Sequence, residues 1–297
     1  MKRTILAAVL FCFVFALAVV TSQAAEPNML VTTGWLSEHL SQPNVVVLHV
    51  GNDRANYDAG HIPGARFVDW VAVTVVRNGV PNQVPAAADL KAAFEKLGVG
   101  DGSQVIIYGD SPLLAALVYF EMDYIGHGAK AAMLDGLLDK WKAEKRPLSK
   151  EQPAVKPATL TVTPNAGLML DMAAVEKIAA EKKLVLVDGR PPDQYTGKDP
   201  GAGVKRGGHI PGAKNVFWAQ TLVSKENPTL KPVEEIRALY EAAGVKPGDP
   251  VVVYCRTGLI ATHAYFTLKL AGFRPQLYDG SFMEWSNAGN TPVESGM

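Results

Sequence analysis

The chain has 297 residues, of which 48% are hydrophobic and 20% charged, so it is long enough for two globular domains with buried cores. Its 29 lysines and arginines balance 29 aspartates and glutamates. This composition is that of a folded protein and gives no electrostatic argument for a nucleic-acid partner or an anionic membrane surface.

A secretory signal peptide is predicted at residues 1–24. Lys2 and Arg3 precede a long apolar stretch, and the small residues Ser22 and Ala24 stand at positions −3 and −1 of a cut after Ala24. We therefore expect an exported protein, periplasmic or secreted, with no membrane segment after cleavage and a net charge near −2. A retained membrane anchor is the alternative.

The mature chain keeps one cysteine, Cys255, because Cys12 lies within the predicted signal. An exported protein with one cysteine makes no internal disulfide, although its compartment permits one. The thiol is therefore either inert or free for chemistry.

The mature chain contains the same unit twice. The sequence GHIPGA at residues 60–65 recurs letter for letter at residues 208–213, and tyrosines and tryptophans around it recur in the same order. This persistence of order and spacing predicts a duplicated domain. The second copy has ten extra residues within 197–207, among them two lysines and an arginine. We expect them to form a mobile loop at the border of a cleft.

Each copy alternates short apolar runs with helical patterns. Strands are expected at residues 45–50, 105–108, 184–188 and 251–254, and helices at residues 90–97, 234–243 and 260–270. The alternation predicts an α/β fold class, in which each domain is a mainly parallel sheet covered by helices and ligands bind at the carboxyl ends of the strands.

The two domains are expected at residues 28–143 and 166–295. Residues 144–165 between them are rich in lysine, proline and threonine and have no apolar period. They therefore predict an exposed linker.

Cys255 follows the predicted strand at 251–254 and stands just before the helical pattern of residues 260–270. The unpaired N–H groups of a helix's first turn favour an anion, so we expect them to lower the pKa of this thiol. Arg256 adds a positive charge, and Gly258 permits the close turn that aims amides at the sulfur. A buried structural cysteine is the alternative, but the loop around it favours a nucleophile.

The first copy has no such nucleophile. Gly109 stands at the position that matches Cys255, and Asp110 replaces the cation Arg256 with an anion. Chemistry is therefore expected in the second domain alone, with the first domain as a scaffold or as one wall of the cleft.

The duplication, the GHIPGA turns, the strand–Cys-x-x-Gly–helix loop and the closing sequence YDGSFMEW at residues 278–285 resemble the tandem-domain rhodaneses. These are sulfurtransferases of the thiosulfate and 3-mercaptopyruvate type. The resemblance implies an inactive first domain and a catalytic second domain whose cysteine, here Cys255, forms a persulfide without a cofactor. It further implies that a small anionic sulfur donor is bound by Arg190, Arg256, Thr257, Gly258, Leu259 and Ile260.

Three positions bear on the choice of donor and on how the persulfide is held. Gln194 stands where the family often has an arginine, which weakens the case for a carboxylate-bearing donor. Ile260 stands where threonine or arginine is common, which leaves the persulfide without that side chain's contact. Arg256 matches many thiosulfate-type loops, whereas the mercaptopyruvate type usually has glycine.

These parts predict a double displacement. A Cys255 thiolate attacks the outer sulfur of thiosulfate or 3-mercaptopyruvate, and the persulfide then passes this sulfur to cyanide or a thiol acceptor. No metal is expected, because none of the histidines lies three or four residues from another histidine or from Cys255.

Other polar side chains are expected to be structural. His61 and His209 should hydrogen-bond the backbone of their turns, and His263 should pack on its helix or lie at the surface. Asp188 should fix a turn or orient Arg190.

Two other function classes compete with the sulfurtransferase. A thiol phosphatase uses a similar thiolate loop but needs an arginine six residues after the cysteine, where this chain has Ala261. An exported, non-catalytic sulfur carrier or binding module with the same fold stays open as the alternative, because of Gln194 and Ile260.

Overall fold

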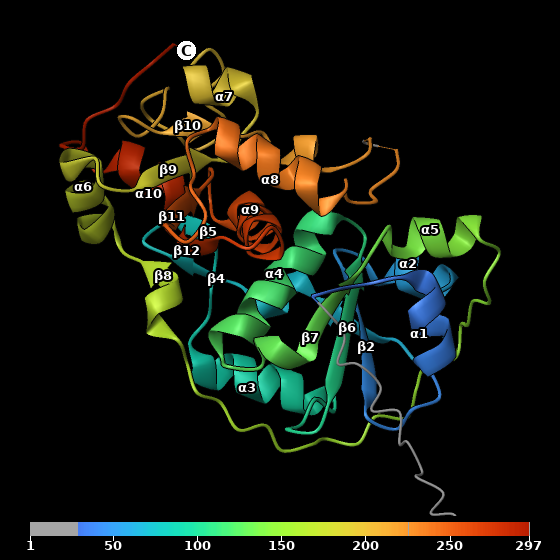
Figure 1. The fold of residues 1–297 in the computed structure, drawn as a ribbon. Helices are drawn as coiled ribbons and strands as arrows, with labels where there is room; N and C mark the ends of the chain where they lie inside the picture. The colour runs from blue at the N-terminus through green and yellow to red at the C-terminus, as the bar shows by residue number, and fades with distance from the viewer. Residues whose placement is uncertain (1–28, 225, 297) are drawn as a thin grey trace, which may run out of the picture.

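The computed structural model describes residues 29–224 and 226–296, which form two α/β domains packed against each other (Figure 1). The predicted signal peptide lies outside these residues. Within the described ranges, no helix combines the length and the apolar character needed to cross a bilayer.

The first domain contains strands β1 (Leu30–Val31), β2 (Val45–Gly51), β3 (Arg66–Asp69), β6 (Gln104–Gly109) and β7 (Ala131–Leu134) and helices α1 (Thr33–His39), α2 (Arg54–Ala59), α3 (Ala87–Lys96), α4 (Pro112–Tyr124) and α5 (Leu137–Ala143). The second contains strands β8 (Met169–Leu170), β9 (Val185–Asp188), β10 (Lys214–Asn215), β11 (Pro250–Tyr254) and β12 (Arg274–Tyr278) and helices α6 (Met172–Glu181), α7 (Pro192–Thr196), α8 (Val233–Ala242), α9 (Leu259–Leu270) and α10 (Ser281–Asn287). The strands and helices expected from the sequence are all present, with small shifts at their ends.

Each domain is built on a sheet of five parallel strands. The first sheet has the order β1-β7-β6-β2-β3, and the second has the matching order β8-β12-β11-β9-β10. The predicted fold class and the duplication are therefore confirmed. The strand that ends at the cysteine, β11, is central in its sheet and buried on both faces, as its continuous valine run requires.

The two GHIPGA turns are locked to their domains by the same hydrogen bonds. The Oη of Tyr57 donates to the Ala65 carbonyl at 2.7 Å, and Tyr195 repeats this bond to Ala213 at 2.7 Å. The imidazole of His209 hydrogen-bonds the Tyr195 carbonyl through Nδ1 at 2.9 Å, and in the first copy His61 hydrogen-bonds the Tyr57 carbonyl in the same way. The structural role predicted for these two histidines is confirmed.

Helices α4 and α9 form the seam between the domains (Figure 1). Tyr119 meets Phe266 edge to face with ring centroids 4.8 Å apart, and Phe120 meets Tyr265 in the same way at 4.8 Å. Because Tyr119 and Tyr265 are equivalent residues of the two copies, the seam is a pseudo-twofold interface. The duplicated domain thus packs on itself as a symmetric dimer would.

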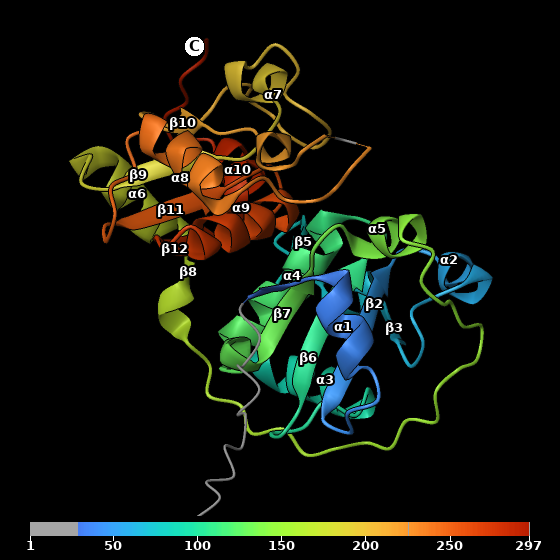
Figure 2. The same cartoon turned by 45° about the vertical axis from the view of Figure 1, so that its right-hand side comes forward.

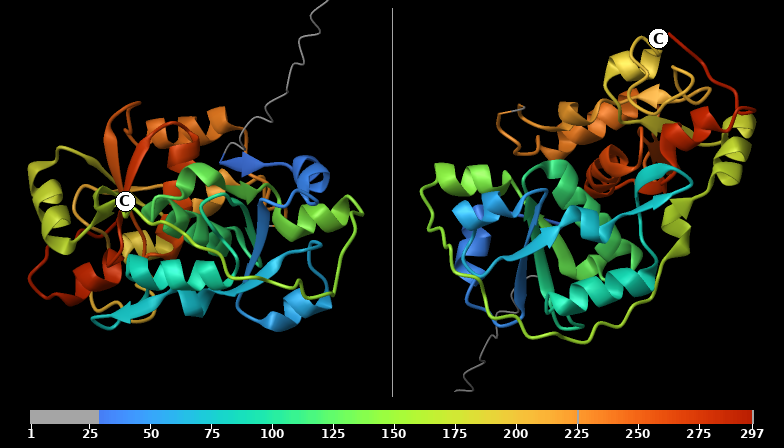
Figure 3. Two further views of the ribbon diagram at one scale, coloured as in Figure 1. Left: turned by 90° about the horizontal axis from the view of Figure 1, so that it is seen from below. Right: turned by 180° about the vertical axis from the view of Figure 1, so that it is seen from behind.

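An antiparallel hairpin in the first domain breaks this symmetry. Strands β4 (Val75–Arg77) and β5 (Val80–Gln83) pair with each other, whereas the described residues of the corresponding part of the second domain form the isolated bridge between Leu222 and Leu230. In Figure 3, right, the cyan hairpin reaches up to the red segments of the second domain.

The segment predicted as a linker, residues 144–165, is mostly exposed but is attached to the first domain along its length (Figure 2). The Ala158 amide donates to the Glu95 carbonyl at 3.1 Å, and the Thr163 amide donates to Ile125 at 2.9 Å. It is therefore a strap on the first domain and not a free tether, a difference that its composition did not predict.

Two carboxyl groups are buried where α4 approaches the second domain. Both carboxyl oxygens of Glu121 on α4 lack a hydrogen-bond partner among the described residues. Burial, followed by the nearby Asp279 carboxylate, raises the pKa of Glu121 well above its usual value. Burial also raises the pKa of Asp279 to about 6.

These shifts make stability depend on pH. In the folded chain both carboxyl groups keep protons that they lose near pH 4 in the unfolded chain. Their contribution to the free energy of unfolding is therefore fully present below pH 4 and is lost as the pH rises through the folded pKa values. We expect Glu121→Gln to be more stable than the wild type at pH 8 and equal to it at pH 4, measured as the free energy of unfolding in urea.

Glu38→Gln on the exposed side of α1 is the matched control, and it should leave stability unchanged at both pH values. If Glu121→Gln and the wild type were equally stable at pH 8, the buried carboxyl would not be held neutral.

Candidate active site

The thiol of Cys255 lies at the carboxyl end of β11, in the loop that leads into α9. Its residue is 1% exposed. The backbone amides of Thr257, Gly258 and Ala261 hydrogen-bond the sulfur. Ala261, on the first turn of α9, was not part of the predicted amide set. The sulfur thus sits where the unpaired amides of a helix start converge, as expected.

The expected lowering of the thiol pKa is wrong. Burial raises the pKa of Cys255, the three backbone amides lower it to a smaller extent, and the Asp188 carboxylate raises it further. The sequence shows that amides converge on the sulfur but does not show how completely the loop and its neighbours exclude water. A donor that carries its own negative charge into this loop meets the same amides.

Gly258 is required by the geometry of the loop. Its φ is +98°, in the left-handed region, and a Cβ at this position would lie 3.1 Å from the Asp279 carbonyl oxygen. A side chain here would be strained and would press on the turn that supports the loop.

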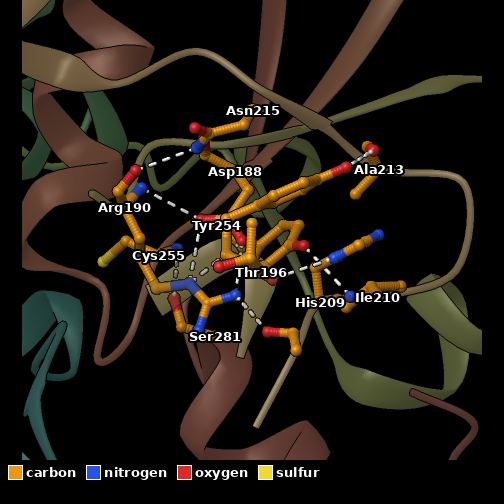
Figure 4. A network of polar contacts seen from close by, with 12 residues as sticks. Asp188, Arg190, Thr196, His209, Ile210, Ala213, Asn215, Tyr254, Cys255 and Ser281 are labelled. Atoms are coloured by element: carbon orange, nitrogen blue, oxygen red, sulfur yellow. Dashed lines mark hydrogen bonds and ion pairs between the residues drawn. The ribbon is translucent and has the colours of Figure 1, made fainter. Parts of the chain in front are cut away.

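Asp188 and Arg190 form a buried ion pair beside the cysteine (Figure 4). The guanidinium donates to Asp188 through Nε at 2.9 Å and through Nη2 at 2.5 Å, and it also donates to the Gly208 carbonyl at 2.7 Å. Asp188 additionally accepts the Arg190 amide at 3.0 Å. The prediction that Asp188 fixes a turn and orients Arg190 is confirmed.

Most of the Arg190 guanidinium is therefore already engaged. Its Nη1 alone has no partner among the described residues, and the carbon between its nitrogens stacks 4.1 Å from the Phe282 ring centroid. The role of Arg190 in binding the donor anion stays a prediction that rests on this one free nitrogen. In Figure 4 the sulfur of Cys255 points away from the guanidinium.

Arg256 is directed toward the insertion 197–207. Its Nη1 donates to the Ala202 carbonyl at 3.2 Å, and its side chain runs beside Gly201. The insertion is fixed at its other end by Arg206, which donates to the Ser286 carbonyl at 2.8 Å. The insertion therefore lies beside the cysteine loop and is bonded to α10. Its mobility stays a prediction.

The remaining predicted binding residues lie around the first turn of α9. The Oγ1 of Thr257 faces the first domain, and Leu259 and Ile260 are half-buried. Gln194, on α7, lies beneath the insertion against Gly201. The structure thus gathers the predicted set near the thiol, but only Thr257 and Gly258 among them have amides that reach the sulfur.

Two supporting residues of the loop come from β12 and α10. The Oγ of Ser281 accepts a hydrogen bond from the Cys255 amide at 3.2 Å and donates to the Tyr278 carbonyl at 3.0 Å.

His263 on α9 is fully buried, and its Nε2 lies 2.9 Å from Thr221 Oγ1. Burial lowers the pKa of His263 to about 4. His263 therefore packs inside the protein, which is one of the two positions expected for it, and does not lie at the surface.

The β4–β5 hairpin of the first domain also contacts the loop, and the sequence reasoning missed it. Asn82 and Gln83 hydrogen-bond Thr257 from across the domain seam. A signal was available, because Asn78 and Gly79 are an Asn-Gly pair between two short apolar runs, and both have the positive φ of a tight hairpin turn.

In the first domain the equivalent site cannot hold a thiol. A Cβ at Gly109 would lie 2.7 Å from the Val50 carbonyl oxygen. Asp110 is bound to the buried His49 at 3.0 Å. In the described part of the chain no group of three or more histidine, cysteine, aspartate or glutamate side chains has the geometry to hold a metal ion.

Comparison with known proteins agrees with this geometry. The model of the rhodanese-like domain matches residues 32–144 and again residues 171–288. The chain belongs to the rhodanese-like family. It is a two-domain sulfurtransferase of the rhodanese type.

Relatives match this rhodanese over most of its length. The sulfur carrier protein TtuD of Thermus thermophilus is 37% identical over 290 residues, which is 92% of this chain and 98% of TtuD. A thiosulfate sulfurtransferase of Corynebacterium glutamicum is 33% identical over 287 residues, 92% of each chain.

Among solved structures, SseA from Escherichia coli, described with the mechanism of 3-mercaptopyruvate sulfotransferases, has a TM-score of 0.76 and 25% identity over 86% of this chain and 99% of SseA.

The loop geometry predicts a clear effect of substitution at Gly258. We expect Gly258→Ala to lower the turnover of sulfur transfer by at least tenfold, because it displaces the amide that faces the sulfur; a barrier change of about 1.4 kcal/mol is enough for this. Steady-state kinetics with thiosulfate and cyanide measures it.

Gly248→Ala is the matched control, since Gly248 also has a positive φ, +83°, but nothing lies within 4 Å of its Cβ position. Both variants place a side chain at a positive φ, and only Gly258→Ala should lose turnover. Equal losses would assign the effect to stability alone.

Proposed function

We propose that this rhodanese moves a sulfane sulfur from thiosulfate, or from 3-mercaptopyruvate, to cyanide or a thiol acceptor through a persulfide on Cys255. The observation that carries the proposal is the placement of the mature chain's one thiol where the amides of Thr257, Gly258 and Ala261 converge. The same amides stabilise a thiolate, a persulfide anion and an anionic donor group.

The reaction proceeds in two displacements. The Cys255 thiolate attacks the outer sulfur of thiosulfate, the sulfur–sulfur bond of the donor breaks with its electron pair, and sulfite leaves. Cyanide then attacks the outer sulfur of the persulfide and leaves as thiocyanate, which regenerates the thiolate. With 3-mercaptopyruvate the carbon–sulfur bond breaks instead, and the pyruvate enolate leaves and takes up the proton of the donor thiol to give pyruvate. Neither displacement needs a cofactor.

Thiosulfate is the preferred donor in this proposal. Arg256 places a cation in the loop. At position 194 the chain has the neutral amide of Gln194, whereas a donor with a carboxylate would bind more strongly to an arginine there. The name of the Corynebacterium relative supports the same choice.

A sulfur carrier is the second candidate function. It is favoured by the name of the Thermus relative and by the burial of the thiol, which protects a bound sulfur from small thiols in solution. In that role the persulfide forms but is released only to a protein acceptor. We further propose that the chain acts after export, in the periplasm or outside the cell, on the basis of residues 1–24.

Intact-mass spectrometry of the mature protein tests the proposal. Incubation with thiosulfate should add one sulfur, about 32 Da, and cyanide should remove it with release of thiocyanate. Cys255→Ala should show neither change. A persulfide that forms but resists cyanide would favour the carrier. A reduced protein that takes no sulfur from thiosulfate or 3-mercaptopyruvate would contradict both functions.

A further inference from the structure

The β4–β5 hairpin of the first domain touches the cysteine loop of the second at several points. Asn82 Nδ2 donates to Thr257 Oγ1 at 2.9 Å. Gln83 Nε2 donates both to the Thr257 carbonyl at 3.3 Å and to the Asp279 carbonyl at 2.8 Å. The Val84 amide donates to Asp279 Oδ2 at 3.0 Å. These bonds join the hairpin to both segments that flank the thiol.

The contact of Gln83 with Thr257 has a direct geometric consequence. The Thr257 carbonyl and the Gly258 N–H belong to one planar, trans peptide unit, so they point in opposite directions. A carbonyl held toward the hairpin therefore directs the Gly258 N–H away from it, and this N–H hydrogen-bonds the Cys255 sulfur. Gln83 thus sets the direction of an amide that it does not touch.

The backbone of the hairpin is shaped for this contact. Side chains of consecutive strand residues point to opposite faces, but Asn82 has a φ of +64°, which interrupts the strand. Asn82 and Gln83 can therefore both reach Thr257. Gln83 is 3% exposed, so its hydrogen bonds to Thr257 and Asp279 are shielded from water.

We propose that Gln83, assisted by Asn82, is a positioning residue for sulfur transfer, supplied by the inactive domain to the catalytic loop of the other. The proposal rests on the proposed function of Cys255. It gives the first domain a task in the reaction although that domain has no nucleophile of its own. The residues act through the Thr257–Gly258 peptide and do not touch the sulfur.

The test compares Gln83→Met and Asn82→Gly with Asn78→Gly. Gln83→Met keeps the length of the side chain and removes its donor, and Asn82→Gly removes the donor while it tolerates the positive φ. Asn78 also has a positive φ, +53°, in the same hairpin but lies at the turn away from the loop. Asn78→Gly is thus the same chemical change without the contact.

We expect Gln83→Met to lower kcat for thiosulfate about tenfold with KM changed less than about twofold, because it removes the buried hydrogen bonds to the Thr257 and Asp279 carbonyls. Asn82→Gly should show a smaller fall in kcat, and Asn78→Gly none. A residue that served stability alone would lower the melting temperature without this split between kcat and KM. Unchanged kcat in both Gln83→Met and Asn82→Gly would overturn the proposal.

Alkylation of Cys255 by iodoacetamide provides a readout that does not need turnover. A loop released from the hairpin opens more often, so Gln83→Met and Asn82→Gly should be alkylated several times faster than the wild type and Asn78→Gly. Equal rates in all four proteins would also overturn the proposal. A wild type that forms no persulfide would remove the proposed function instead, and the alkylation rates would still report whether the hairpin holds the loop.

Discussion

The sulfur of Cys255 is buried, so in the proposed reaction the charge that develops on it is stabilised by oriented backbone amides and not by water, although burial outweighs these amides in the thiol pKa. This stabilisation depends on angle, because a peptide N–H stabilises an anion only when it points at it. The positive φ of Gly258, the hydroxyl of Ser281 beneath the Cys255 amide and the Gln83 amide across the seam all fix the direction of peptide planes. The reactivity proposed for the thiol thus depends on the residues that hold these peptide planes.

Those supports come from both domains, which makes the packing of α4 on α9 part of the site. The edge-to-face pairs of Tyr119 with Phe266 and of Phe120 with Tyr265 set the distance between the domains. An isolated second domain would keep its cysteine and its helix but would lose the shielded bonds to Thr257 and Asp279.

The sequence predicted those features that depend on local residue patterns and on the internal repeat. The valine run of β11, the repeated GHIPGA turns and the position of Cys255 follow from periodicity and self-similarity. It did not predict contacts that join distant segments, such as Gln83 with Thr257, or the attachment of the strap through Ala158. The sign of the thiol pKa shift was missed for the same reason, because burial is set by residues far away in the chain.

At the centre of the seam, Asp123 of the first domain forms an ion pair with Lys269 of the second and accepts the hydroxyl of Tyr265. Asp123 and Lys269 are equivalent positions of the two copies, so each stands close to the pseudo-twofold axis. Two identical subunits would place like charges face to face there. The two copies instead carry opposite charges at these positions, so the two halves of this chain are complementary to each other there.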